Sequence, residues 1–251
     1  MNIGIVGGTG FIGSNLCKQF YPCTKFNSEN INDIKGNKFD IVINSAPSGV
    51  KWLANKNPDR DLSSIHSLIT KLKKVSTSKF ILISTIDIFE TPLDTYEEDV
   101  SSSKKHHPYG RNRLHLEKFA QDNFKDCFII RMPIVYGDGF KKNFLFDLLN
   151  NNEVEKLNPN SLVQVYNVDN LKKDIEFMIE KDIHVLNMAT FPISIGEIAS
   201  RIFSREGLNY KKVNGFYKTN MKTNYSFTKN DSNGYLYNKN DVIEDLVKYF
   251  S

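Results

Sequence analysis

Glycines close to the amino terminus have a spacing that can hold a pyrophosphate. Gly7, Gly10 and Gly13 recur every third residue, directly after a short apolar run. Such glycines let the chain turn tightly, let the backbone approach the phosphates, and let the next helix pack close to the strand. Free amides at the start of that helix, including those of Phe11 and Ile12, meet the phosphate charge. The pattern predicts a dinucleotide site, and its alternative is a glycine turn without a ligand.

The ribose of a bound dinucleotide is expected at the end of the second strand. An acidic residue about twenty positions after the glycines would hold the 2′-hydroxyl of NAD there. The candidates are Asn27 and Ser28, with Lys25 just before them. Because the position holds neither an obvious acid nor an arginine, the sequence leaves both NAD and NADP open.

Apolar periodicity predicts that strands and helices alternate over residues 1–131. The expected strands are 2–6, 24–27, 40–44, 80–84 and 127–131. The expected helices are one that begins at Phe11, then 61–75 and 108–123. This alternation implies right-handed crossovers and a parallel sheet covered on both faces. We therefore expect an α/β fold, a doubly wound parallel sheet of the Rossmann type with a small C-terminal substrate lobe.

The second half of the chain has shorter and less regular elements. The helices expected there are 143–149, 168–179, 196–203 and 241–250, and the strands are 162–166 and 185–186. The polar stretch 91–107 is expected to be a loop at the surface or over a site. We expect residues 1–138 to form the dinucleotide-binding core. Residues 139–251 are expected to be mainly a substrate-binding lobe, with some segments returning to the core.

Composition disfavours several classes of protein. The 251 residues carry 33 basic and 29 acidic side chains, a net charge of +4 without any long block of one sign, which disfavours a nucleic-acid or membrane-surface binder. The three cysteines have neither zinc-site nor disulfide-framework spacing, which fits a reducing cytosol. No apolar run approaches the roughly twenty residues that cross a bilayer. We expect a soluble, cytoplasmic protein.

Four motifs follow one another along the chain. After the glycines come Ile-Ser-Thr-Ile-Asp-Ile-Phe at 83–89, Pro-Tyr-Gly-Arg-Asn-Arg at 108–113, and Arg-Met-Pro-Ile-Val-Tyr-Gly at 131–137. With them the chain resembles the extended short-chain dehydrogenase/reductases of the NAD-dependent epimerase/dehydratase type, which act on nucleotide sugars. The resemblance covers about residues 1–200. It implies NAD or NADP as cofactor, a nucleotide-sugar substrate, and a homodimer paired through the helices 61–75 and 108–123.

The resemblance also implies the catalytic residues. In the family a Ser or Thr and a Tyr flank the reacting oxygen, and a Lys follows four residues after the Tyr. By position these are Thr85, Tyr109 and, as a departure, Arg113. Tyr109 and Arg113 share one helix face, so the cation can lie near the phenol and the cofactor ribose.

A cation near the phenol has a clear chemical use. A phenol with a pKa near 10 needs roughly 4 kcal/mol to ionise near pH 7, and a cation about 5 Å away supplies roughly 3 kcal/mol. Arginine can provide this charge, but it is bulkier than lysine and cannot give up a proton.

Further positions follow from the resemblance. Ser45 and Ala46 end the strand 40–44 where the family lines the cofactor, and Pro133 lies where the family closes over the nicotinamide. A plain turn explains the first two residues nearly as well. His106 and His107 lack matching metal ligands, so no metal is expected.

The expected reaction is hydride transfer. Dehydratases of the family carry Asp-Glu directly after the Thr, whereas this chain has Ile86 and Asp87, so dehydration is not expected. We therefore predict an NAD(P)-dependent oxidoreductase or epimerase that performs 4-ketoreduction or 4-epimerisation on a nucleotide-diphosphate sugar. The alternative is a non-catalytic dinucleotide-binding sensor or complex subunit that kept the glycine turn and lost the lysine.

Overall fold

A computed structural model describes residues 1–100, 106–205, 215–227 and 233–251. The chain divides into two compact units. The first unit contains Met1–Glu90, Asp99–Arg131 and Asp169–Leu186. The second contains Thr91–Glu98, Met132–Val168 and Asn187–Ser251.

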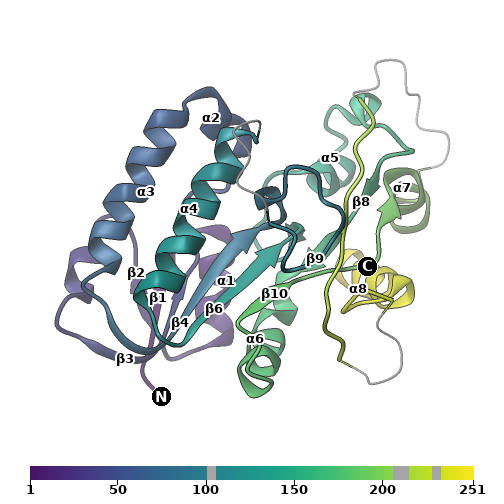
Figure 1. Cartoon of the computed structure of the whole chain (residues 1–251). Coiled ribbons are helices and arrows are strands. Elements are labelled where there is room, and N and C mark those ends of the chain that lie inside the picture. Colours follow the sequence, from purple (N-terminus) through teal and green to yellow (C-terminus); the bar gives the residue numbers. More distant parts are fainter. Residues whose placement is uncertain (101–105, 206–214, 228–232) are drawn as a thin grey trace. The chain divides into compact units, whose positions relative to one another are not determined.

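The first unit is built on a six-stranded sheet of order β10-β6-β4-β3-β1-β2 (Figure 1). The bounds are β1 Ile3–Val6, β2 Thr24–Phe26, β3 Lys38–Asn44, β4 Ser76–Thr85, β6 Cys127–Met132 and β10 Val185–Asn187. β1 pairs in parallel with both β2 and β3, and β3 pairs in parallel with β4. The middle of the sheet is apolar and buried, at residues 41–43 of β3 and 80–83 of β4, as expected where helices cover both faces.

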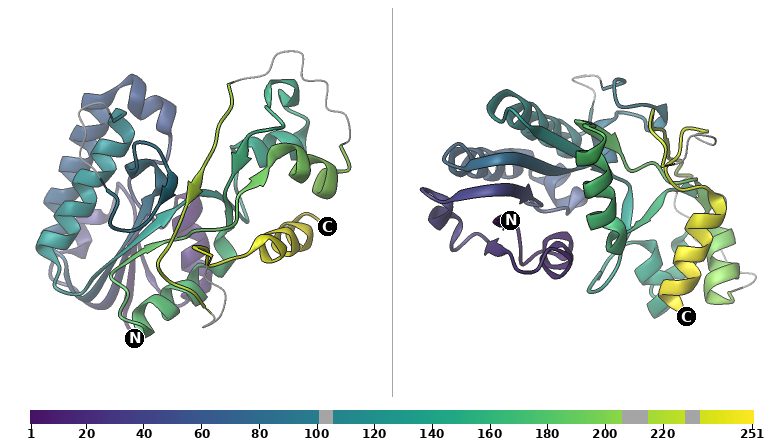
Figure 2. Two further views of the ribbon diagram at one scale, coloured as in Figure 1. Left: turned by 45° about the vertical axis from the view of Figure 1, so that its right-hand side comes forward. Right: turned by 90° about the horizontal axis from the view of Figure 1, so that it is seen from below.

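Helices cover the two faces of this sheet. Their bounds are α1 Phe11–Gln19, α2 Lys51–Lys56, α3 Pro58–Leu72, α4 Pro108–Asn123 and α6 Leu171–Glu180, with short 3-10 helices η1 Ile31–Ile34 and η2 Ile86–Ile88. Figure 2 shows α3 and α4 side by side on one face and α1 on the other, where α6 contacts α1. Ile65 and Leu72 of α3 and Phe80 of β4 are fully buried. Phe80 stacks on Phe124 with ring centroids 3.9 Å apart. The doubly wound α/β arrangement predicted from the sequence is confirmed.

A buried ion pair lies inside the first unit beside the end of β4. Arg131 Nη2 is 3.0 Å from Glu117 Oε2, and both side chains are at most 5% exposed. Arg131 Nε donates to Glu117 Oε1 at 3.3 Å, and Ser84 Oγ donates to the same oxygen at 2.5 Å. The guanidinium also lies 5.4 Å from the centre of the Phe89 ring. These contacts connect α4, β4 and β6 immediately next to Thr85.

The second unit consists of short strands and helices. Its strands are β5 Leu93–Thr95, β7 Ile134–Tyr136, β8 Leu162–Val163, β9 Val165–Asn167, β11 Ile193–Ser194 and β12 Asn220–Met221. Its helices are α5 Phe144–Asn150, α7 Ile195–Phe203 and α8 Lys239–Phe250, with the 3-10 helix η3 Val154–Lys156. The 3-10 helix η4 Val168–Asn170 begins at the last residue of the segment Met132–Val168 and continues into the first unit. Gln164 is fully buried, and its amide donates to the carbonyls of Thr190 and Met221 while its side-chain oxygen accepts from the Met221 amide. A buried polar side chain thus joins three segments of this unit.

Several element boundaries differ from the predictions. The helix expected at 61–75 begins at Pro58 and ends at Leu72. It begins earlier than predicted because proline fits the first helical position, and Asp59 and Asp61 interact favourably with the positive end of the helix dipole. The expected strand 162–166 is two strands, since Gln164 separates β8 from β9. The helix expected from 168 begins at Leu171 after a 3-10 turn.

The segment expected to be a loop at 91–107 contains the strand β5, which pairs in parallel with β12. Residues 101–105 of this expected loop lie outside the described residues.

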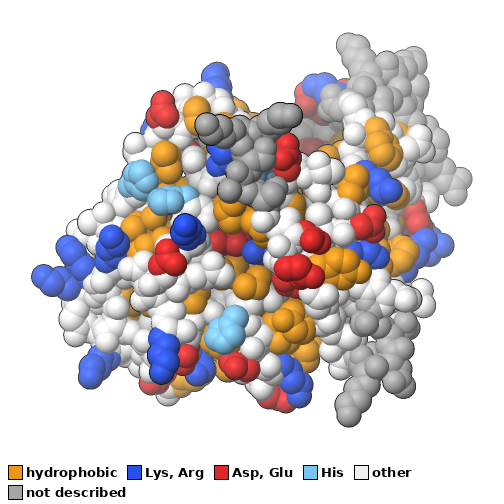
Figure 3. Space-filling view, viewed as in Figure 1, with side chains coloured by type: hydrophobic (Ala, Val, Ile, Leu, Met, Phe, Trp, Pro, Cys, Tyr) orange, Lys and Arg blue, Asp and Glu red, His pale blue; other side chains and the backbone are white. Residues whose placement is uncertain are grey.

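Charge is mixed on the face that Figure 3 presents. Lys and Arg side chains alternate with Asp and Glu side chains across it, and hydrophobic side chains are scattered between them. Within the ranges that the structure describes, a helix with the length and apolar character needed to cross a membrane is not found.

Candidate active site

The predicted phosphate turn lies between β1 and α1. The Gly7 amide donates to the Phe26 carbonyl at 2.8 Å, and the Gly10 amide donates to the Gly7 carbonyl at 2.9 Å. Gly7 has φ +82°, a conformation that favours glycine. A Cβ atom on Gly13 would lie 2.1 Å from the Gly7 carbonyl oxygen. The turn is therefore as tight as the spacing predicts, and the first-turn amides of α1, which begins at Phe11, lack carbonyl partners from a preceding helical turn.

Gly13→Ala should lower both stability and dinucleotide binding. The new methyl group would press the Gly7 carbonyl out of the turn, a strain of about 1–3 kcal/mol. Because α1 shifts with it, we expect the affinity for NAD or NADP to fall by about tenfold or more. Urea unfolding and calorimetric titration measure the two effects. The control is Gly215→Ala, where an added Cβ meets nothing within 4 Å. Equal affinity in Gly13→Ala and wild type would show that the turn does not position the ligand.

The other predicted cofactor residues of the first unit surround the same turn. Ser45 Oγ donates to the Val6 carbonyl at 2.9 Å, and a Cβ on Gly7 would be 2.8 Å from the Ala46 amide nitrogen. Asn27 directly follows β2, and its side-chain oxygen accepts from the amides of residues 29 and 30 at 2.8 and 3.2 Å. That oxygen closes the local turn. Pro133 belongs to the second unit, between β6 and β7. Contact of these residues with a cofactor stays a prediction.

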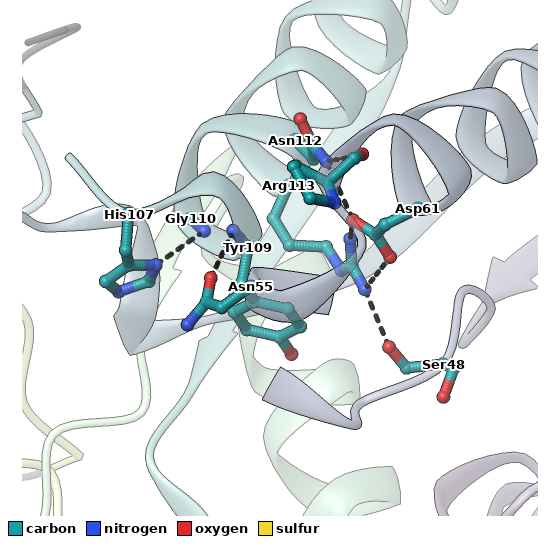
Figure 4. Close-up of polar contacts among 9 residues, drawn as sticks. Ser48, Asn55, Asp61, His107, Tyr109, Gly110, Asn112 and Arg113 are labelled. Atoms are coloured by element: carbon teal, nitrogen blue, oxygen red, sulfur yellow. Dashed lines mark hydrogen bonds and ion pairs between the residues drawn. The ribbon is translucent and has the colours of Figure 1, made fainter. Parts of the chain in front are cut away.

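Tyr109 is placed by the start of α4. Its backbone amide donates to Asn55 Oδ1 at 2.9 Å (Figure 4), and its side chain is only 7% exposed. The guanidinium carbon of Arg113 lies 4.2 Å from the ring centroid. Burial raises the pKa of the phenol above its ordinary value, and the negative charge of Asp87 adds to this, while Arg113 and Thr85 act in the opposite direction without reversing the shift. The structure thus brings together the phenol, the hydroxyl and the guanidinium that the sequence singled out.

Arg113 is held by partners that sequence reasoning did not find. Its Nη1 and Nη2 atoms bond the two carboxylate oxygens of Asp61 at 2.8 and 3.1 Å, and Nη2 also donates to the Ser48 carbonyl at 2.6 Å (Figure 4). Asn112 donates to the same carboxylate at 2.8 Å. Arg113 is therefore a fixed cation beside the Tyr109 ring, tied to protein groups through these bonds. Its predicted contact with the cofactor ribose stays a prediction.

A second cluster of charged groups lies around Asp87, just after Thr85. Lys51 Nζ is 2.6 Å from Asp87 Oδ1, and His107 Nε2 is 3.8 Å from the same oxygen. His107 caps α4, because its Nδ1 accepts from the Gly110 amide at 3.0 Å. A Cβ on Gly110 would lie 2.0 Å from the Asp87 carbonyl oxygen, so glycine is needed for this approach. Asp87 therefore joins α2 to the start of α4.

Acid should destabilise the protein through buried histidines. Burial lowers the pKa of His106 and His107 below the ordinary value of about 6.5. At pH values between the folded-state and the unfolded-state pKa, the unfolded chain binds more protons than the folded protein. The contribution of these histidines to the free energy of unfolding is therefore complete above pH ~6.5, and it is lost as the pH falls through the lowered folded-state pKa. Urea midpoints across this range measure the loss.

The matched variant for this effect is His107→Asn. Asparagine is a good N-cap but does not titrate, so we expect a shallower dependence of the urea midpoint on pH than in wild type. A midpoint that falls as steeply in the variant would exclude His107 as a source of the pH dependence.

The histidines next to Tyr109 lack the partners of a metal site. In the described part of the chain, no three His, Cys, Asp or Glu side chains are grouped so that they could hold a metal ion. The rings of His106 and His107 lie with their centroids 4.4 Å apart and are tilted by 52°.

Comparisons with known proteins give a consistent result. Residues 3–187 match the NAD dependent epimerase/dehydratase family. No curated protein sequence matches the chain. Among solved structures, a dTDP-4-dehydrorhamnose reductase from Clostridium acetobutylicum is similar at 18% identity with a TM-score of 0.66, covering 99% of this chain and 93% of that one.

Two other solved structures are similar over nearly their full length. MoeE5, solved in complex with UDP-glucose and NAD, has 17% identity and a TM-score of 0.72, with 100% of this chain and 97% of that one covered. A UDP-N-acetylglucosamine 4-epimerase from Bacillus cereus has 17% identity and a TM-score of 0.65, with 99% and 98% covered. At these identities the likeness concerns the fold.

Proposed function

This chain belongs to the NAD dependent epimerase/dehydratase family, and from that membership we propose that it is an NAD(P)-dependent oxidoreductase or epimerase acting on a nucleotide-diphosphate sugar. The observation that carries the proposal is the convergence of Tyr109, Thr85 and Arg113 in the first unit. The similar structures support the substrate class, since they include a reductase and an epimerase of nucleotide sugars and a protein with UDP-glucose and NAD bound.

The residues of the first unit fit a dinucleotide. The first-turn amides of α1, next to the tight turn at Gly7 and Gly13, would bind the pyrophosphate, and the small residues Ser45 and Ala46 lie beside the turn. The bound nicotinamide supplies the hydride acceptor or donor. Asn27 and the neighbouring Lys25 offer neither the acid that selects NAD nor an arginine for a 2′-phosphate, so both cofactors are proposed.

The proposed mechanism assigns a separate task to each side chain. Tyr109 gives a proton to the substrate oxygen, or takes one from it, as hydride moves to or from the carbon that bears this oxygen. Thr85 hydrogen-bonds the reacting oxygen. Arg113 stabilises the phenolate of Tyr109 by its charge, because its carbon lies 4.2 Å from the ring and its bonds to Asp61 prevent it from moving away.

The proposal is tested with pure protein, NADH or NADPH, and a panel of UDP-, GDP- and dTDP-linked sugars and 4-keto sugars. Loss of absorbance of the reduced cofactor reports ketoreduction, and chromatography of the sugar nucleotides reports 4-epimerisation. Turnover of a member of the panel is the expected result. If every member is inert although the cofactor binds, the protein is not such an enzyme.

The second candidate function is a non-catalytic dinucleotide sensor or complex subunit. It is favoured by one observation, namely that the residue in the lysine position, Arg113, is engaged by Asp61 and Ser48. The variant Arg113→Lys separates the two candidates. A large gain in turnover would indicate a site that has decayed, whereas a loss would show that arginine is part of a working site.

Assembly and location belong to the same proposal. We propose a homodimer paired through α3 and α4, the helices that lie side by side on one face of the sheet, and light scattering on the pure protein tests it. The cysteines Cys17, Cys23 and Cys127 are free, which supports a cytoplasmic protein.

A further inference from the structure

Two histidines lie side by side on the outside of the first unit. His66 belongs to α3 and His115 belongs to α4, the helices that pack against each other on one face of the sheet. Their ring centroids are 5.2 Å apart, and the ring planes are inclined by 78°. Both residues are exposed to solvent. Figure 3 shows histidine side chains, in pale blue, next to one another at the surface over these two helices.

Helix packing sets the distance between these two histidines. The residue before His66 is Ile65, which is fully buried, and the residue after His115 is Leu116, which is 2% exposed. These apolar neighbours hold both helix backbones against the core of the first unit, so the Cα atoms of the two histidines stay close. The rings themselves are in solvent and can still rotate about their side-chain bonds. The protein therefore fixes the spacing of the pair and leaves the direction of the ring nitrogens adjustable.

The spacing of the rings suits a metal ion shared by both. Neutral imidazole is a preferred ligand of zinc, copper and nickel dications. Two imidazoles bound to one ion at a tetrahedral angle, each with a metal–nitrogen bond of about 2.1 Å, have ring centres roughly 5 Å apart. The distance of 5.2 Å between His66 and His115 agrees with this arrangement. Only rotation of exposed side chains is then needed to direct a nitrogen of each ring to the ion.

The ring nitrogens of the pair are available to an ion. Among the residues that the structure describes, neither ring pairs with a carboxylate or donates to a carbonyl. His184 differs, because its Nδ1 is 2.9 Å from the Cys127 carbonyl oxygen and its Nε2 is 3.4 Å from Asp182 Oδ1. Burial lowers the pKa of His115, and the nearby His66 and Lys118 add to this, so the His115 ring is uncharged at neutral pH.

We propose that His66 and His115 form a chelating pair for a divalent transition-metal ion such as Zn²⁺. The pair supplies two of the four ligands of a tetrahedral ion, and within the described ranges no third His, Cys, Asp or Glu side chain joins them. Water completes the coordination in a single chain. In the homodimer proposed above, the pair of a second copy would replace this water, because both residues lie near the middle of the helices that pair. The chelating pair itself needs only one chain.

Positive charges beside the pair limit its affinity for a dication. Arg111 and Lys118 lie one helical turn before and after His115. Both are exposed, so solvent and salt screen their repulsion of the ion, and the bonds to two imidazole nitrogens outweigh what remains. Lys118→Gln should therefore bind Zn²⁺ more tightly than wild type. An ion bound elsewhere on the chain would not respond to this substitution.

The test is calorimetric titration of the full chain with ZnCl₂ at neutral pH, in a buffer that does not bind zinc. His66→Gln and His115→Gln should each weaken binding by about 10²-fold, the gain that linking two ligands provides. The double variant should bind hardly more weakly than either single variant, because one imidazole alone cannot chelate. His115→Cys should retain binding, since a thiolate is also a zinc ligand. In wild type, the ¹⁵N signals of both rings should shift together as Zn²⁺ is added.

The matched control is His184→Gln, which removes an imidazole whose side chain is 50% exposed and should leave zinc affinity unchanged. Mg²⁺ should not compete, because it prefers oxygen ligands. Wild-type affinity in both His66→Gln and His115→Gln would overturn the proposal, as would a wild type that does not bind Zn²⁺. One ion per chain, or one per two chains with a dimer in light scattering, would support it. Because no cofactor or sugar is present, these outcomes are independent of whether the proposed enzymatic function is correct.

Discussion

Tyr109→Phe should reduce turnover of the nucleotide sugar by about 10²–10⁴-fold, the usual contribution of a general acid or base. The variant removes the hydroxyl that exchanges a proton with the reacting oxygen. It leaves the ring, which packs beside Arg113, and it leaves the glycine turn. We therefore expect affinity for the dinucleotide to stay close to that of wild type, so that the loss appears in kcat and not in cofactor binding.

The control for this variant is Tyr21→Phe, which removes a hydroxyl from a tyrosine that is 85% exposed. It should have normal turnover. Stopped-flow measurement of nicotinamide absorbance under single-turnover conditions isolates the chemical step. Full turnover by Tyr109→Phe would remove the phenol from the mechanism and would leave the cofactor-binding sensor as the better account of the fold.

Local sequence signals predicted the helix and the turn that position this site. The helix that carries Tyr109 has the predicted bounds, Pro108–Asn123, because proline at its first position and the His107 cap define its start. The glycine turn likewise has a geometric requirement at Gly13 that only the smallest residue meets. Such features depend on neighbouring residues, so a single sequence contains them.

The partners of the site residues could not be predicted in the same way. Asp61 and Arg113 are 52 positions apart, and Lys51 and Asp87 are 36 apart. These pairs form because helices and loops that follow different strands meet at one edge of the sheet. No periodicity connects them, and the side-chain directions that pair them depend on packing between α2, α3 and α4.

The partner of Glu117 could not be predicted from the sequence either, and substitution of Glu117 gives the largest expected effect on stability. In the sequence it is one more charged residue in a helix, yet its side chain is 2% exposed and binds Arg131. Glu117→Ala leaves the guanidinium of Arg131 buried without its counter-charge. Since an unpaired buried charge costs far more than the pair contributes, we expect the free energy of unfolding to fall by about 3–5 kcal/mol.

Urea unfolding of Glu117→Ala beside two further variants measures this cost and identifies its cause. Glu180→Ala removes an exposed partner of Lys181 and should change the urea midpoint little, because exposed ion pairs contribute little to stability. The double variant Glu117→Met/Arg131→Met removes both charges and should recover most of the stability, because the desolvation cost of the pair disappears together with its attraction. If the double variant is instead no more stable than Glu117→Ala, the unpaired charge of Arg131 is not the cause of the loss.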